Sequence, residues 1–320
     1  MAVEIALVVL GLAILLLGGD LLVRGAVGLA AALKIPALIV SLTVVAFGTS
    51  APELVVTIQA VSSGNAGIAL GNIIGSNIAN VLLVLGLPAI IYPVSTHVDG
   101  LRRHVGFMLV ATGVFAAIAY TRGFLDFSYG AALFAGILIY VTYMWVRAAG
   151  GKSHDPVLDE VDEYLEDAGI SAKTMAFIAA GLIGLPLGAH LLVTNGESLA
   201  LALGVRESVI GLTIIAFGTS LPELATVIAA AFHKKSDVAI GGIIGSNIFN
   251  LLAVGGAAGL VGVSRFHPVS LAVDIPVMIA AALLLALYVF TKRDIGRWSG
   301  IFMFGAYIGF MIAIAGIESA

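Results

Sequence analysis

The 320-residue chain contains no cysteine and few charged residues. The absence of cysteine excludes disulfide bonds and thiolate metal sites, and it leaves the redox compartment unspecified. Asp, Glu, Lys and Arg make up only 11% of the residues, whereas 60% are hydrophobic and the mean hydropathy is +1.13. This balance excludes an ordinary soluble globular protein and indicates a chain that crosses a membrane many times. A GxxxxGK[ST] phosphate loop is also absent from the sequence, so we do not expect ATP to drive this chain.

Apolar runs long enough to cross a bilayer recur along the whole sequence. A spanning helix needs about 20 such residues, and a helix satisfies all of its own backbone groups in lipid. The sequence therefore predicts an all-α polytopic membrane protein with ten transmembrane helices, over about 3–30, 36–61, 66–91, 104–120, 127–147, 173–200, 206–231, 238–262, 268–290 and 298–317. The first run follows Glu4 and no basic leader, so we expect a retained helix and not a cleaved signal.

The second half of the sequence repeats the first at an offset of 170 residues. SLTVVAFGTSAPE (41–53) and GLTIIAFGTSLPE (211–223) agree at nine of thirteen positions. GNIIGSNIAN (71–80) and GGIIGSNIFN (241–250) agree at eight of ten. Each half holds five predicted helices, and because five is odd, the second half enters the membrane from the opposite face. Inverted repeats are typical of transporters, whose substrate site lies near the midplane where the halves meet.

These repeats predict three parts: a first five-helix repeat at 1–148, an acidic linker at 149–172 and a second, inverted repeat at 173–320. Of the fifteen lysine and arginine residues, twelve fall at or near one set of loops and three at the other. Because basic loops face the cytoplasm, we expect both termini outside the cell membrane and the linker inside. The linker holds seven acids; a soluble segment with a short amphipathic helix is expected, with a regulatory cation site as the alternative. The ligand spacing of an EF-hand is absent from it.

Both long motifs predict helices that break near the membrane midplane. Pro52 lacks a backbone N–H and clashes with the carbonyl of Gly48. We expect the carbonyls of residues 46–49 to lack helical partners and to face protein or a water-filled cavity rather than lipid. Positions i, i+3, i+4, i+7 and i+11 share one helix face, which here carries Ala46, Thr49, Ser50, Glu53 and Thr57. The second copy repeats the arrangement with Pro222 and with Ala216, Thr219, Ser220 and Glu223.

A second polar stripe follows in each half. The first-half stripe is Asn72, Ser76 and Asn80, and in the second half Gly242, Ser246 and Asn250 take these places. All the polar groups of both stripes and both broken helices present oxygen, and none is a thiol or imidazole. Hard cations such as Ca²⁺ and Na⁺ prefer such ligands, whereas soft transition metals do not.

Charge predicts that the two glutamates share a cation. One ionised acid at the bilayer centre costs about 2.5–3.5 kcal/mol on insertion scales. Two carboxylates roughly 5 Å apart repel by about 3 kcal/mol at an effective dielectric of 20. Glu53 and Glu223 should therefore bind a cation or a proton, and their two charges match one divalent ion.

At these residues the chain resembles the calcium/cation antiporters, specifically the prokaryotic type of sodium/calcium exchanger. The resemblance covers essentially the whole chain and is carried by the paired GTSxPE and GSNIxN motifs. It implies four ion sites at the centre of ten helices. It implies Glu53 and Glu223 as shared Ca²⁺ and Na⁺ ligands, and Thr49 and Thr219 as carbonyl ligands. The other implied ligands are Ala46 and Ala216 through their carbonyls, Ser50, Ser220, Ser76 and Ser246 for Na⁺, and Asn80 and Asn250 as a central polar pair.

The resemblance implies exchange of Na⁺ for Ca²⁺ by a monomeric transport unit in a lipid bilayer. It implies no cofactor, no nucleic-acid partner and no enzyme activity. Asn250 resembles potassium-independent exchangers, and the absence of an acid beside Ser76 and Ser246 argues against proton coupling. A K⁺-dependent or H⁺-coupled antiporter and a Ca²⁺ channel using the same oxygens remain alternatives. An intramembrane hydrolase would need an activated nucleophile, and no His/Asp or Cys/His set lies at membrane depth.

Overall fold

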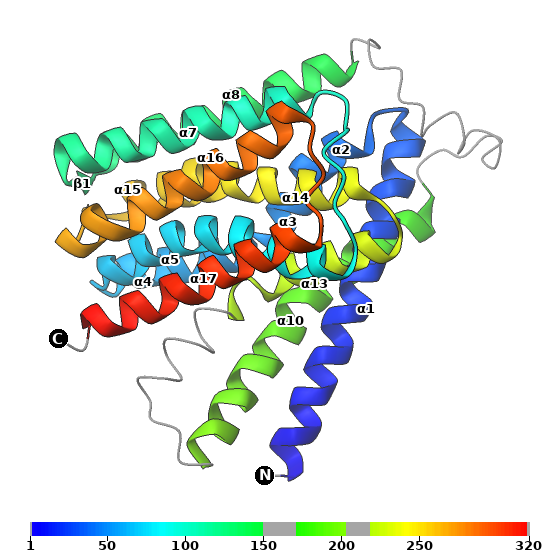
Figure 1. The fold of residues 1–320 in the computed structure, drawn as a ribbon, viewed down its shortest axis with the longest axis horizontal. Coiled ribbons are helices and arrows are strands. Elements are labelled where there is room, and N and C mark those ends of the chain that lie inside the picture. The colour runs from blue at the N-terminus through cyan, green and yellow to red at the C-terminus, as the bar shows by residue number, and fades with distance from the viewer. Residues whose placement is uncertain (1, 150–170, 203–217, 319–320) are drawn as a thin grey trace.

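The computed structural model describes residues 2–149, 171–202 and 218–318, and these are helical almost throughout (Figure 1). The elements of the first half are α1 (Ala2–Leu33), α2 (Ala37–Val40), η1 (Ser41–Val45), α3 (Ala46–Thr49), α4 (Ala51–Ser62), α5 (Ala66–Ala79), η2 (Asn80–Leu85), α6 (Gly86–Ile91), α7 (Leu101–Arg122), β1 (Phe124–Leu125) and α8 (Phe127–Ala149). Those of the second half are α10 (Ala172–Ala202), α13 (Leu221–Phe232), α14 (Ser236–Phe249), η4 (Asn250–Val254), α15 (Gly255–Val261), β2 (Ser264–Arg265), η5 (Ser270–Asp274), α16 (Ile275–Thr291) and α17 (Arg297–Glu318). The η segments are π-helical turns.

The helices confirm an all-helical polytopic membrane protein. In the described part of the chain, eight helical runs are long and apolar enough to cross a bilayer, and the bent pair Ala37–Thr49 and Ala51–Ser62 makes a ninth. The remaining predicted span, 206–231, lies partly outside the described residues, and α13 covers its second part. The acidic stretch of the linker also lies outside them. The count of ten spans and their inverted order therefore stay predictions.

Two of the runs form the centre of the molecule. The most apolar window of the run Ala66–Ile91 is 83% buried, and that of Ser236–Val261 is 94% buried, against 17% for Arg297–Ile317. Both central runs contain a π-helical turn, η2 and η4, which begins at the last asparagine of the GSNIxN motif. The polar stripes predicted from sequence therefore lie in the core, while α1, α8, α10 and α17 expose apolar side chains outward.

Helices α1 and α10 pack side by side and project from the rest of the bundle (Figure 1). Glycine lets their backbones approach closely: a Cβ added at Gly11 would meet the carbonyl oxygen of Gly188 at 2.8 Å, and the converse distance is also 2.8 Å. Small residues are the usual means of close helix packing in lipid, where the hydrophobic effect gives no drive for association. The pair therefore forms a tight two-helix unit.

Short backbone pairings tie the ends of the bundle. Strands β1 and β2 pair antiparallel, Phe124 with Arg265 and Leu125 with Ser264. An isolated bridge joins Val94 to Ile295. Helices α7 and α16 contact each other between these pairings, and a helix as long as α7 spans about 33 Å. The pairings therefore lie at opposite ends of the molecule and join its two halves at both.

Candidate ion-binding site

The predicted break of each motif helix occurs at a serine. Ser50 has φ −85° and ψ 1°, and Ser220 has φ −88° and ψ 4°, so the two breaks have nearly the same geometry. The axis bends by 42° between Ala37–Thr49 and Ala51–Ser62. Pro52 and Pro222 occupy the second positions of the helices that follow, where a missing N–H leaves no intrahelical bond unmade.

Each predicted acid stands in the first turn of the helix after the break. Glu53 is the third residue of α4, and Glu223 is the third residue of α13. Their exposed fractions are 1% and 2%. The positive end of the helix dipole stabilises a negative charge at this position. The breaks thus place two buried carboxylates at two helix N-termini.

One expectation about the first break is wrong. The carbonyl of Ala46 was expected to lack a helical partner, but it accepts hydrogen bonds from Ser50 N at 3.0 Å and Thr49 Oγ1 at 3.4 Å. The reason is that Ser50 still closes the last turn of α3 while its own dihedral angles leave the helix. The five residues of the predicted face, Ala46 to Thr57, are all buried, as expected.

Glu223 is the centre of a hydroxyl cluster that includes residues from both halves of the chain. Its Oε1 accepts hydrogen bonds from Ser246 Oγ at 3.1 Å and from Ser50 Oγ at 3.4 Å. The two serine hydroxyls lie 2.6 Å apart. Thr49 Oγ1 lies 3.4 Å from Ser246 Oγ. Four of the predicted site residues are therefore in contact. Thr49 and Ser50 come from the first half of the chain, and Glu223 and Ser246 from the second.

Glu53 is positioned through its backbone by the following helix. The side-chain amide of Asn72 donates to the carbonyl oxygen of Glu53 at 3.2 Å and to Thr57 Oγ1 at 3.0 Å. Asn72 comes from α5 and Thr57 from α4, so these bonds fix the α4–α5 pair. The sequence predicted the stripe that holds Asn72 but not this positioning contact.

Asparagines from both halves meet at the centre. Asn80 Nδ2 donates to Asn247 Oδ1 at 3.0 Å. This bond joins the two central runs. Asn77, in contrast, donates to Ile73 O of its own helix at 2.8 Å. The predicted pair of Asn80 and Asn250 is buried at 1% and 0% exposure.

Several buried oxygen and nitrogen atoms of the predicted site have no hydrogen-bond partner among the described residues. Buried polar atoms without partners are costly and rare in native proteins. Here they are Oε2 of Glu53 and of Glu223, Oδ1 of Asn80, Oγ of Ser220 and both side-chain polar atoms of Asn250. These atoms belong to five of the twelve predicted ligands, and the oxygens among them are of the kind that binds hard cations.

For the remaining predicted ligands that lie among the described residues, the structure gives burial but no side-chain contact with the site. Ser76 is 4% exposed, and its hydroxyl makes no recorded bond to a described residue. Thr219 is half-buried beside Ser220. Ala216 lies outside the described residues. The second-half motif is therefore defined only from Gly218 onward.

The sequence missed two polar contacts near the site. Ser41 Oγ, in η1, donates to Val238 O of α14 at 2.7 Å and ties the first broken helix to the second central run. Asp20 pairs with Arg24, one turn further along α1, at 2.9 Å. Asp20 also bonds the ring of His233, at the end of α13. No periodicity indicated this third partner, because His233 stands in a turn far away in sequence.

The types of donor atom at the site indicate which class of metal ion it can bind. The described residues contain no group of three or more His, Cys, Asp or Glu side chains able to hold a metal ion. The site instead combines two carboxylates with neutral hydroxyl and amide groups, which suits a hard cation that leaves again rather than a tightly held transition metal. A buried polar centre in a helical bundle with two broken helices is the arrangement of a membrane transporter.

Comparison with known proteins identifies the family. The model of the sodium/calcium exchanger protein family matches residues 3–147 and 173–316. The chain is 34% identical to the inner membrane protein YrbG of Escherichia coli over 96% of its own length and 95% of the relative's. It is 31% identical to the sodium/calcium exchanger MaX1 of Methanosarcina acetivorans, over 98% of both chains.

A solved structure agrees with these relatives. The sodium-calcium exchanger NCX_Mj, soaked with Na⁺ and Sr²⁺, superposes with a TM-score of 0.82 at 32% identity, over 98% of both chains. The fold and the site therefore define an integral membrane antiporter, and the matching family and solved structures are those of transporters. The chain belongs to the sodium/calcium exchanger family, in its prokaryotic form.

Proposed function

We propose that the protein exchanges Na⁺ for Ca²⁺ across the cell membrane by alternating access. One observation carries the proposal: Glu53 and Glu223 are buried in the first turns of two helices, and each has a carboxylate oxygen without a hydrogen-bond partner among the described residues. Two such charges balance one Ca²⁺. Together with the nearby hydroxyl and amide oxygens, the same two carboxylates can bind several Na⁺ ions instead of Ca²⁺.

The proposed ligands are the twelve residues of the two motif pairs. Glu53 and Glu223 take part in binding both ions. Thr49 and Thr219 contribute backbone carbonyls to the same centre. The Na⁺ ions additionally use the carbonyls of Ala46 and Ala216 and the hydroxyls of Ser50, Ser220, Ser76 and Ser246, with Asn80 and Asn250 as the central pair. The contacts of Glu223 with Ser50 and Ser246 support this grouping.

The proposed architecture is ten helices in two inverted five-helix repeats, residues 1–148 and 173–320, joined by the linker 149–172. Three matched features support it. The helix breaks at Ser50 and Ser220 have nearly equal dihedral angles, and both acids are third in their helices. The π-helical turns η2 and η4 begin at Asn80 and Asn250, also 170 residues apart.

The proposed stoichiometry is three Na⁺ for one Ca²⁺, which moves one net charge per cycle. For roughly a tenfold Na⁺ gradient and a potential of about 100 mV, inside negative, each entering Na⁺ yields about 3.7 kcal/mol. Exporting Ca²⁺ against about a 10⁴-fold gradient costs about 10.1 kcal/mol under the same conditions. Two Na⁺ yield about 7.4 kcal/mol, which is too little, and three yield about 11.1 kcal/mol, which suffices.

The exchange is proposed to be independent of K⁺ and not coupled to protons. Asn250 supplies a dipole but no third negative charge, so the centre lacks the extra anion that a K⁺ ion would balance. Ser76 and Ser246 stand where an additional acid would serve proton exchange. Both residues are buried, with exposed fractions of 4% and 0%.

We further propose that both termini face the outside of the cell and that the linker faces the cytoplasm. The proposed transport unit is a monomer, because both halves of one chain contribute residues to the hydroxyl cluster around Glu223. The excess of lysine and arginine at one set of loops supports the orientation.

The test is Na⁺-driven uptake of ⁴⁵Ca²⁺ into proteoliposomes, with K⁺ or an inert cation present. An exchanger requires Na⁺ on the face of the membrane opposite to Ca²⁺. Because the proposed exchange moves one net charge per cycle, its rate should also change with the membrane potential. Calcium uptake that persists without any Na⁺ would instead identify a channel. Uptake driven by a pH gradient alone would identify the proton-coupled alternative.

A further inference from the structure

A basic pocket lies at one end of the bundle, away from the ion site. It has a volume of about 510 Å³ and is formed by the segment before α7, the first turn of α7 and the end of α16. Arg102, Arg103 and Lys292 contribute cationic side chains to its wall, and Asp99 is the one carboxylate among the lining residues. We call these three cations and their cavity the basic pocket.

The walls of the basic pocket are fixed by bonds between the two halves of the chain. Val94 and Ile295 exchange backbone hydrogen bonds of 3.0 and 2.9 Å. Asp294 Oδ1 accepts hydrogen bonds from Ser95 Oγ and Thr96 N, each at 3.0 Å. On the α7 side, Arg102 Nη2 donates to Phe290 O at 2.9 Å. The pocket is therefore a built cavity and not a gap between loose loops.

In the described part of the chain, no ion pair neutralises the cations of the basic pocket. The recorded ion pairs of the described residues are those of Asp20 with Arg24 and His233 and of Asp294 with His97. None of them includes Arg102, Arg103 or Lys292. Gly100, the N-cap of α7, has no side chain that could occupy the pocket or accept from the first-turn amides. Positive groups from two helices thus converge on one cavity.

Lys292, which lines the pocket, has an unusual backbone conformation. It ends α16 in the left-handed region, with φ 52°. Glycine is favoured in that region because it has no Cβ, and Gly64 and Gly123 occupy it after α4 and α7. A lysine there places an ammonium group in the pocket where a glycine would fold with less strain.

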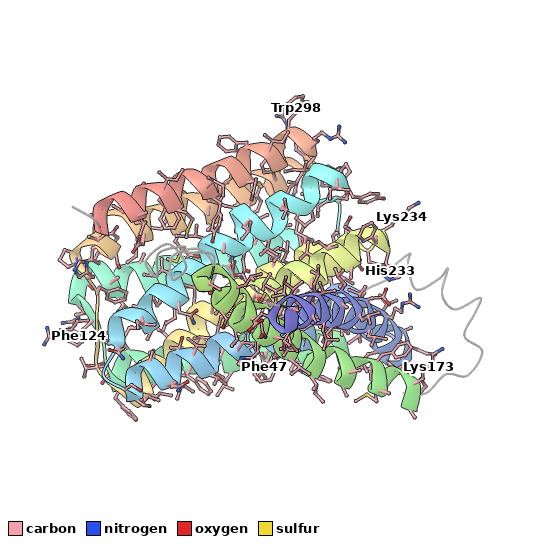
Figure 2. All side chains as sticks on the ribbon, turned by 90° about the horizontal axis from the view of Figure 1, so that it is seen from below. Phe47, Phe124, Lys173, His233, Lys234 and Trp298 are labelled. Carbon is pink, nitrogen blue, oxygen red and sulfur yellow. The ribbon has the colours of Figure 1, made fainter. Side chains whose placement is uncertain are left out.

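The surroundings of the basic pocket are suited to lipid. The outer face of α16 exposes Leu283, Leu287 and Phe290, at i, i+4 and i+7, by 55%, 59% and 47%. This apolar stripe leads directly to Lys292. Trp298, at the start of α17, is 80% exposed at the end of the molecule opposite Phe124 (Figure 2), and exposed tryptophan is enriched at membrane–water interfaces.

We propose that the basic pocket binds the phosphate group of an anionic phospholipid. The stripe on α16 accommodates an acyl chain in the membrane, while the three cations receive the headgroup at its surface. Basic pockets between membrane helices recognise anionic headgroups in this way. The binding would tie the end of α16 to the start of α7, and it does not depend on which ions are transported.

The test uses the purified, delipidated full-length protein and follows its thermal midpoint as lipid is added. Cardiolipin should stabilise the wild type, whereas phosphatidylcholine and millimolar inorganic phosphate should not. Lys292→Gly and Arg103→Gln should each weaken the apparent affinity for cardiolipin about fivefold. Glycine suits φ 52°, so Lys292→Gly keeps its fold.

Lys34→Gly is the matched control. Lys34 has the same conformation, with φ 53°, at the end of α1 and lines no part of the pocket. This variant removes the same charge and should bind cardiolipin like the wild type. Equal losses in the Lys34 and Lys292 variants would mean diffuse surface attraction and overturn the pocket. Equal stabilisation by inorganic phosphate would overturn the assignment to lipid.

Discussion

At the scale of single residues, the site depends on two carboxylates. Glu53→Gln or Glu223→Gln removes half of the charge that balances Ca²⁺. At an effective dielectric of 20 this loses well over 1.4 kcal/mol of attraction, so Na⁺-driven ⁴⁵Ca²⁺ flux should fall at least about tenfold. The variants should fold, since the amide fills the same space, and a size-exclusion profile and thermal midpoint check this.

Asp126→Asn provides the control for the glutamate variants. Asp126 Oδ1 accepts from Ser128 N and Tyr129 N at the start of α8, far from both breaks in sequence, and an asparagine oxygen can accept in its place. Its flux should equal that of the wild type. A Glu53→Gln or Glu223→Gln protein with full flux would remove that residue from the site.

Asn250 is the residue on which the proposed independence from K⁺ rests. Asn250→Asp adds a third negative charge to the proposed centre, and at about 5 Å from another carboxylate it would be repelled by about 3 kcal/mol at an effective dielectric of 20. The new acid then either holds a proton or recruits another cation. We expect the variant's Ca²⁺ flux to depend on pH or K⁺, unlike that of the wild type.

The measurement is Na⁺-driven Ca²⁺ flux between pH 6 and 9, with K⁺ or an inert cation. Asn250→Ser serves as control, since it removes the amide without adding charge. If the wild type needs K⁺, or if the Asn250→Asp profiles overlay those of the wild type, the central place given to Asn250 is wrong.

The sequence predicted the burial of the candidate site residues better than their bonds. The buried face from Ala46 to Thr57 followed from helical periodicity and one proline, because both act locally. The partner of Asn77 and the bonding of the Ala46 carbonyl did not follow, because each depends on a local geometry that spacing does not encode. The bond of Asp20 to His233 depends on tertiary packing between distant segments and had no local signal.

At the scale of elements, the close contact of α1 with α10 makes a test. A Cβ at Gly11 would meet backbone atoms of Gly188 and Leu192 at 2.8 Å, and a backbone cannot move aside as a side chain does. Gly11→Ala should therefore lower the free energy of unfolding by about 1–3 kcal/mol. In contrast, a Cβ at Gly196 of α10 meets nothing within 4 Å.

Gly196→Ala is thus the matched control and should stabilise the helix by about 0.5–1 kcal/mol. Thermal unfolding in one detergent compares the two variants with the wild type. A Gly11→Ala protein as stable as Gly196→Ala would show that α1 and α10 do not approach each other as described.

The loop between α16 and α17 predicts a dependence on pH. Partial burial raises the pKa of Asp294, but hydrogen bonds from Thr96 N, His97 and Ser95 outweigh it and hold the pKa below its ordinary value. A carboxylate with a lowered folded pKa stabilises the fold above its unfolded pKa of about 3.9. That stability is lost as pH falls through the folded pKa.

Asp294→Asn should therefore lower the thermal midpoint at pH 7, and the difference from the wild type should shrink as pH falls below about 4. Asp99→Asn, in the neighbouring loop, controls for general loss of charge and should show no such convergence. A constant difference between wild type and Asp294→Asn from pH 7 to pH 3 would contradict the role given to the carboxylate.

The elements themselves were predictable to different degrees. The membrane-spanning helices could be predicted from long apolar runs, because a segment in lipid must satisfy its own backbone groups by forming a helix. The π-helical turns at Asn80 and Asn250 were not predicted, since a one-residue insertion in a helix leaves the apolar pattern almost unchanged. The bend after Thr49 was predicted as a break, but its angle of 42° depends on how α14 packs against η1 and α3.

At the scale of the whole molecule, the two ends of the bundle differ in the residue that follows a helix in the left-handed conformation. The left-handed residue after α4 is Gly64, and the residue 170 positions later, after α13, is Lys234. A glycine and a lysine also follow α7 and α16, at Gly123 and Lys292, which are 169 positions apart. Under an inverted repeat, each glycine faces outward and each lysine faces the cytoplasm. Lysine also suits the negative end of a helix dipole and the cytoplasmic side.

This pattern gives the last prediction, which concerns the orientation of the two halves. In the cysteine-free background, Ser63→Cys and Lys234→Cys place single thiols in the matching turns after α4 and α13. Both positions are exposed or nearly so, and Figure 2 shows Lys234 at the end of the molecule opposite Phe124. An impermeant maleimide should label Ser63→Cys from outside intact cells and Lys234→Cys only after the membrane is opened. Glu160→Cys, in the predicted cytoplasmic linker, should behave like Lys234→Cys. Labelling of the first two thiols from the same side would mean that equivalent turns face the same way, and the inverted arrangement of the repeats would have to be abandoned even if both glutamates still bound Ca²⁺.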